Sequence, residues 1–80
     1  MRQGSLYKHE ACTDVALMPV KRPFFVPEKK IYKVRCRWYN IVNPDNVFEC
    51  GEGIDNVVIK EEDIRRWRFY EPKQIPEKQS

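Results

Sequence analysis

Apolar and polar residues alternate over one stretch of the chain, YKVRCRWYNIV, which begins at Tyr32. One set of alternate positions holds Tyr32, Val34, Cys36 and Trp38, and the other holds Lys33, Arg35, Arg37, Tyr39 and Ile41. A period of two places the two sets on opposite faces of a β-strand. We therefore expect a strand that buries its apolar face and projects a basic row into water, with Tyr39 beside that row.

Shorter apolar runs predict further strands. They span residues 6–9, 15–18, 54–59 and 68–70. The run at residues 24–26 is different, because Pro23 and Pro27 bracket it. Proline removes a backbone hydrogen-bond donor, so this run is expected at a turn or a sheet edge rather than in a central strand.

Three segments are not expected to form strands. Residues 1–4 are predicted to be a loose arm, and the sequence CGEG at residues 50–53 is predicted to be a flexible break. The sequence KEEDIRRW places three acidic residues before two arginines, which suits the dipole of one helical turn. Ile64 and Trp67 are three residues apart and would face the same side of that turn.

The order of these elements predicts a mainly β fold. Four or five short strands with one helical turn before the last strand fit a small SH3-like β-barrel, and closure of the sheet would remove exposed strand edges. The alternative is an open sheet of three or four strands with one short helix against it. A chain of 80 residues allows one domain. We place it at residues 1–72, followed by a flexible C-terminal tail at residues 73–80.

Charge is distributed unevenly along the chain, although its net value is only +3. Residues 21–37 contain seven basic residues and one acid, whereas residues 43–63 contain seven acids and one base. If the two segments pair as neighbouring strands, opposite charges can neutralise one another across the ladder. Otherwise the domain is a charge dipole that can steer one face towards an acidic partner.

Few residues could support catalysis or metal binding. His9 and Cys12 are spaced as HxxC, but structural zinc sites use two such close pairs, and Cys36 and Cys50 do not form the second one. His9 is the single histidine, and the chain has no glycine-rich phosphate loop. We therefore expect a protein that is not an enzyme and that uses no metal or other cofactor.

Cysteine usage and hydropathy indicate the compartment. Three cysteines cannot complete a set of disulfides, which favours reduced thiols in a reducing environment. No apolar run approaches the length of a membrane span, and the N-terminal sequence MRQGSLYKHEA lacks the apolar core of a signal peptide. We expect a soluble, cytoplasmic protein without a membrane partner.

The basic row is the strongest candidate for a functional site. The candidate partner-binding residues are Lys33, Arg35, Arg37 and Tyr39, together with Arg66 and Arg68 if the last strand pairs nearby. Basic side chains beside an aromatic ring suit an acidic protein surface, and they also suit the phosphates and bases of a nucleic acid. The acidic half of the chain would repel a long phosphate backbone, so the protein partner is favoured. The simplest alternative is a solvated strand face paired with acids such as Glu49 and Asp55.

The adjacent residues Phe24 and Phe25 are a second place where a partner could bind. Both cannot easily face one core if the backbone is extended, so one could be an exposed hydrophobic anchor. We expect instead that the loop folds over the end of the barrel and buries both rings.

Three stretches of the chain resemble short uncharacterised proteins encoded in tailed-phage genomes: GSLYKHEACTDVAL, KVRCRWYNIV and VIKEEDIRRWRFYEP. The matching positions are Gly4, Ser5, Tyr7, Lys8, His9, Asp14, Val15, Lys33, Val34, Trp38, Asn40, Ile59, Lys60, Asp63, Ile64 and Trp67. The resemblance implies an SH3-like fold and an infected bacterial cell. It transfers no catalytic residue, because that family has no assigned activity. It is compatible with an accessory protein that binds a host or phage protein, and also with a structural component of the virion.

Overall fold

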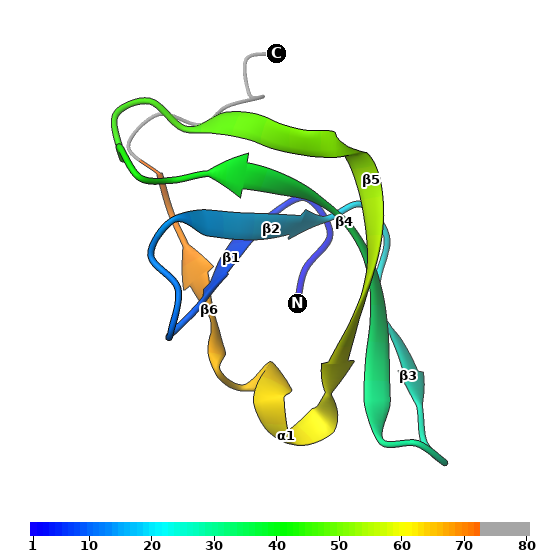
Figure 1. Cartoon of the computed structure of the whole chain (residues 1–80). Coiled ribbons are helices and arrows are strands. Elements are labelled where there is room, and N and C mark those ends of the chain that lie inside the picture. Colours follow the sequence, from blue (N-terminus) through cyan, green and yellow to red (C-terminus); the bar gives the residue numbers. More distant parts are fainter. Residues whose placement is uncertain (73–80) are drawn as a thin grey trace.

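Six antiparallel strands and one helical turn make up residues 1–72, the part of the chain that the computed structural model describes (Figure 1). The elements are β1 (Leu6–His9), β2 (Val15–Pro19), β3 (Phe24–Val26), β4 (Ile31–Asn40), β5 (Phe48–Lys60), α1 (Glu61–Ile64) and β6 (Trp67–Tyr70). The predicted mainly β fold, with one helical turn before the last strand, is confirmed. The prediction of four or five short strands is wrong, since the described residues form six strands, of which β4 has 10 residues and β5 has 13.

Strand β4 organises the sheet because it has neighbours along both edges. β5 pairs with one edge, while β2 and β3 pair with different halves of the other. β1 then pairs with β2, and β6 pairs with β1. The sheet curls into a half-barrel, and α1 connects β5 to β6 at its lower end (Figure 1). Within residues 1–72, β3, β5 and β6 each pair with one strand only. The sheet is therefore not closed, and each of these strands keeps one unpaired edge.

The predicted break at residues 50–53 lies inside β5 and is an irregularity rather than an end. Cys36 of β4 pairs with Asp55, but Trp38 pairs with Cys50, so residues 51–54 lie opposite Arg37 alone. Gly51 and Gly53 have φ angles of 85° and 95°, in the left-handed region that glycine enters without steric cost. The strand therefore turns sharply partway along its length and continues (Figure 1).

Two hydrophobic clusters pack on opposite faces of the sheet. The Leu17 cluster comprises Leu17, Val34, Cys36 and Ile59, and the Tyr39 cluster comprises Leu6, Ala16, Tyr39, Ile41 and Val47. Ala16 and Leu17 are neighbours in β2, yet both are fully buried, because successive side chains of a strand point to opposite faces. Strand β2 is therefore covered on both sides.

The N-terminal residues are held against the domain, so the prediction of a loose arm is wrong. Met1 packs on the Leu17 cluster. The backbone N–H of Arg2 donates to the hydroxyl of Tyr7 at 2.7 Å, and that of Gly4 donates to the carbonyl of Pro19 at 2.9 Å. Met1 is the only apolar residue in residues 1–4, so the segment shows no periodic pattern that would predict its contact with the Leu17 cluster.

The helical turn α1 has the acidic first turn that the sequence predicts. Ile64 and Trp67 both pack against the Leu17 cluster, as their spacing predicts. No helix within residues 1–72 is long and apolar enough to cross a membrane. The predicted flexible tail, residues 73–80, lies outside the described residues.

Candidate interaction surface

The alternation predicted for β4 is confirmed over the first part of the strand. Val34 and Cys36 are buried in the Leu17 cluster, whereas Lys33 and Arg35 are exposed. The apolar face of this strand therefore supplies the core, and the basic face is available to a partner.

Strand pairing places exposed apolar side chains on both sides of the basic residues. Lys33 lies opposite Phe24 of β3 and opposite Val58 of β5, and directly paired residues share a face of the sheet. Phe24 is 65% exposed and Val58 is 60% exposed. The exposed residue Lys60 pairs with the residue two positions before Lys33, so it lies on the same face. We define the Lys33 patch as Phe24, Lys33, Arg35, Val58 and Lys60.

The patch stays basic because of the strand register. The basic and acidic segments do lie side by side, as β4 and β5. In this register, however, Lys33 lies opposite Val58, and Arg35 lies opposite Asn56. Within residues 1–72 the salt bridges involve neither of them, nor Lys60. The acidic strand therefore leaves these three cations uncompensated on one face.

Arg37 is the member of the basic row that does have an acidic partner. Its Nη1 donates to Oε2 of Glu49 across β4 and β5 at 3.0 Å. Both side chains are 39% exposed, so water screens the pair and it contributes at most about 1 kcal/mol. Arg37 is thus partly neutralised and lies at the margin of the patch.

Tyr39 is buried, and the prediction that it lies exposed beside the basic row is wrong. It is on the same face of β4 as Arg37, but it is only 2% exposed. Ile41 and Val47, from the segment after β4, pack with it in the Tyr39 cluster. The residues that cover this end of the face lie outside the strand, so the alternation within β4 could not reveal them.

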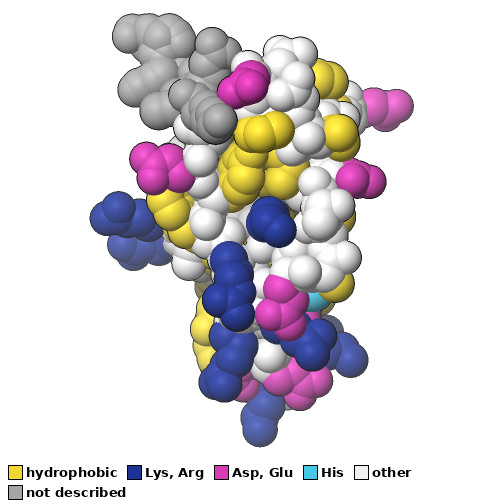
Figure 2. Space-filling view, turned by 90° about the vertical axis from the view of Figure 1, so that its left-hand side faces the viewer, with side chains coloured by type: hydrophobic (Ala, Val, Ile, Leu, Met, Phe, Trp, Pro, Cys, Tyr) yellow, Lys and Arg dark blue, Asp and Glu magenta, His cyan; other side chains and the backbone are white. Residues whose placement is uncertain are grey.

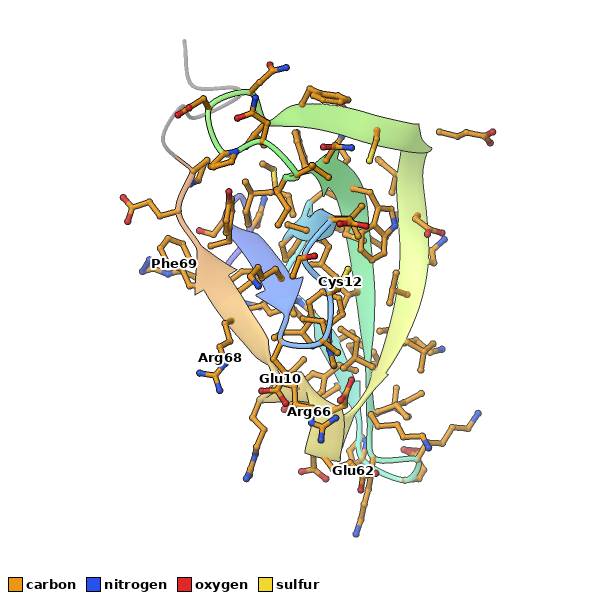
Figure 3. The ribbon with its side chains drawn as sticks, turned by 60° about the vertical axis from the view of Figure 1, so that its left-hand side comes forward. Glu10, Cys12, Glu62, Arg66, Arg68 and Phe69 are labelled. Carbon is orange, nitrogen blue, oxygen red and sulfur yellow. The ribbon has the colours of Figure 1, made fainter. Side chains whose placement is uncertain are left out.

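Arg66 and Arg68 do not flank the basic row. β6 pairs with β1, so β1 and β2 separate it from β4. Glu10 forms ion pairs with Nε of Arg66 at 3.2 Å and with Nη2 of Arg68 at 3.5 Å (Figure 3). Viewed from the side of β6, the lower half of the molecule mixes basic with acidic side chains (Figure 2). The two arginines therefore belong to a separate, internally paired group of charges.

The two adjacent phenylalanines separate, so the expectation that both are buried is wrong. Phe25 is half-buried and its ring lies 4.8 Å from that of Tyr32, while Phe24 is exposed. Because β3 is extended, the two side chains point to opposite faces. The alternative, in which one ring is an exposed anchor, is the observed arrangement.

His9 links β1 to α1. The backbone N–H of Ala11 donates to Nδ1 of His9 at 3.0 Å, so the neutral ring carries its proton on Nε2, which lies 3.2 Å from Oδ1 of Asp63. The ring also meets Trp67 edge to face, with 5.2 Å between centroids. Within residues 1–72, no group of three or more His, Cys, Asp and Glu side chains could hold a metal ion.

The three cysteines are free thiols in different surroundings. Cys12 and Cys50 are half-buried, and Cys36 is fully buried. Burial, with a smaller contribution from the Asp55 carboxylate, raises the pKa of the Cys36 thiol to about 11. Cys36 therefore stays protonated near neutral pH and acts as an apolar filler of the core.

Alkylation of the folded protein should distinguish these thiols. At about pH 8, we expect iodoacetamide to modify Cys12 and Cys50 and to leave Cys36 unmodified, because the thiolate is the reactive form. Peptide mapping by mass spectrometry, with and without denaturant, measures this directly. Modification of Cys36 in the folded protein as fast as the other two would contradict its burial.

Comparison with known proteins adds no relative. No family model, no curated protein and no solved structure matches the chain. What the Lys33 patch can bind must therefore be inferred from its own charge and shape.

Proposed function

We propose that this protein is a non-enzymatic, SH3-like interaction module that binds a protein with an acidic surface through the Lys33 patch. The observation that carries the proposal is the joint exposure of Phe24 and Val58 on either side of Lys33. Exposed apolar side chains can anchor a partner, while surrounding cations select an acidic one.

The SH3-like assignment is supported by the order of pairing. The last strand pairs with the first, the sheet curls strongly, and a helical turn precedes the last strand. The resemblance to tailed-phage proteins supports an accessory role in the cytoplasm of an infected bacterium, with a host or phage protein as partner.

A role without catalysis is supported by the surroundings of the most plausible catalytic groups. The single histidine, His9, is engaged by Asp63 and by the backbone of Ala11. The raised pKa of Cys36 keeps that thiol protonated. A small domain whose exposed face combines charge and apolar area is suited to presenting a surface.

Two other functions share the same surface chemistry. Lys33, Arg35 and Lys60 could contact phosphates, with Phe24 stacking on a base, as in a nucleic-acid-binding SH3-like domain. Alternatively, the domain could be a structural component of the virion. A gel shift separates nucleic-acid binding from protein binding. Light scattering on the purified protein tests whether it forms the oligomers expected of a virion component.

Reversing two charges of the patch should abolish capture of the partner. We expect the wild-type protein to retain an acidic protein from a bacterial lysate, and Lys33→Glu/Arg35→Glu to lose it, because two attractive contacts become repulsive. Capture followed by mass spectrometry, with elution by increasing salt, measures this. A gel shift with DNA and RNA at two salt concentrations tests the nucleic-acid alternative.

The control is Arg2→Glu/Arg68→Glu, which changes the net charge by the same amount at exposed positions outside the patch. It should retain the partner. Equal capture by wild type and both variants would contradict the proposed surface. A salt-sensitive gel shift without protein capture would instead assign the patch to nucleic acid.

A further inference from the structure

A small acidic pocket opens at the irregularity in β5. It has a volume of about 320 Å³ and is lined by Trp38, Gly51, Glu52, Gly53, Ile54 and Asp55. No lining residue is basic. Arg37 lies opposite this irregularity, but it projects from the other face of β4 and pairs with Glu49. The pocket is therefore on the face opposite to the Lys33 patch, and its charge has the opposite sign.

An indole ring forms one wall of this pocket. Trp38 packs against the Leu17 cluster, yet it also lines the pocket. A side-chain carbon at position 51 would lie 3.9–4.0 Å from Cβ and Cδ1 of Trp38. Because residue 51 is glycine, no side chain covers the indole there. The left-handed φ of 85° also disfavours any larger residue at this position.

The two carboxylates of the pocket differ in how firmly they are held. Oδ2 of Asp55 accepts a hydrogen bond from Nε1 of Trp38 at 3.0 Å, and Oδ1 accepts one from the backbone N–H of Asn56 at 2.8 Å. These bonds orient the carboxylate, and each oxygen keeps a further lone pair. Glu52 is exposed and forms no salt bridge within residues 1–72.

We infer that this pocket binds the guanidinium group of an arginine side chain presented by a partner protein. A planar cation can stack on an indole and donate hydrogen bonds to two carboxylates at once. The pocket is open and is large enough for a side chain. Sites for free small molecules usually enclose most of the ligand, so an open pocket favours a side chain that a partner protein holds in place. An ammonium group would make fewer directed contacts there.

The indole N–H of Trp38 provides a direct probe of this site. The chain has two tryptophans, so a ¹H–¹⁵N spectrum has two indole signals, which Trp38→Phe assigns. Titration with a blocked arginine peptide should shift the Trp38 signal to saturation at millimolar concentrations, as expected for one exposed cation site. The same peptide with citrulline, the neutral isostere of arginine, should not shift it.

Variants of the carboxylates complete the test. Glu52→Gln should weaken arginine binding by no more than about fivefold, the upper end of the range for one exposed charge pair. Glu52→Gln/Asp55→Asn should abolish saturation. The circular dichroism spectrum, which should match that of the wild type, reports that the fold is intact. Equal shifts with the arginine and citrulline peptides, or an undiminished shift in the double variant, would overturn the inference. Because neither carboxylate belongs to the Lys33 patch, this result is independent of the capture experiment.

Discussion

Replacement of Leu17 by alanine should lower the free energy of unfolding by about 4 kcal/mol, within the range for buried leucines. Leu17 is fully buried on β2 and lies in the cluster that includes Val34, Cys36 and Ile59. Strand β2 is covered on both faces and paired on both edges, so the surrounding residues have little freedom to collapse into the cavity. Domains of this size have a total stability of only about 4–12 kcal/mol.

Urea denaturation followed by tryptophan fluorescence measures this change. Val42→Ala is a suitable control, because Val42 is 63% exposed and its truncation should change stability by less than about 0.5 kcal/mol. A loss below about 1 kcal/mol for Leu17→Ala would show that β2 is not packed between two clusters.

Replacement of Tyr39 by alanine should be almost as damaging, with a loss of about 3–5 kcal/mol as for other buried aromatic side chains. Tyr39 is 2% exposed and packs with Ala16, Ile41 and Val47. Phe24→Ala is the matched comparison, because Phe24 is an aromatic residue of the same sheet that is 65% exposed. Its truncation should cost less than about 1 kcal/mol.

The two aromatic variants also separate folding from binding. Phe24→Ala should stay folded and still weaken partner capture, since its ring is an exposed anchor of the Lys33 patch. Equal destabilisation by the two variants would contradict the assignment of Tyr39 to the core and of Phe24 to the surface. Chemical denaturation and circular dichroism on the same samples provide both measurements.

Local patterns predicted the elements well. Residues 6–9 form β1 and one helical turn precedes the last strand, both as predicted. Residues 24–26, which lie between two prolines, form an edge strand. Proline has no backbone N–H to donate to a neighbouring strand, so it is disfavoured in central strands. The error at residues 50–53 has a clear cause: glycines that usually interrupt a strand here let β5 turn while it stays paired with β4.

The candidate site was predicted only in part. The alternation in β4 predicted that Lys33 and Arg35 are exposed. In β5, the same alternation places the side chain of Val58 on the face opposite to Val57 and Ile59. That Val58 and Phe24 both lie beside Lys33 depends on how three strands align. A shift of one residue in either pairing would have placed other side chains beside Lys33.

The sequence by itself determined which face of the first part of β4 is apolar, where the helical turn lies and which segments are rich in one charge. These properties follow from side-chain period and local composition, and they need no knowledge of neighbours. Only the tertiary structure decided that Tyr39 is covered and that Arg66 and Arg68 belong to another edge. It also decided that Arg37 meets Glu49, whereas Lys33 and Arg35 form no salt bridge among the described residues. Each of these outcomes depends on register and strand order, which arise from contacts between segments distant in the chain.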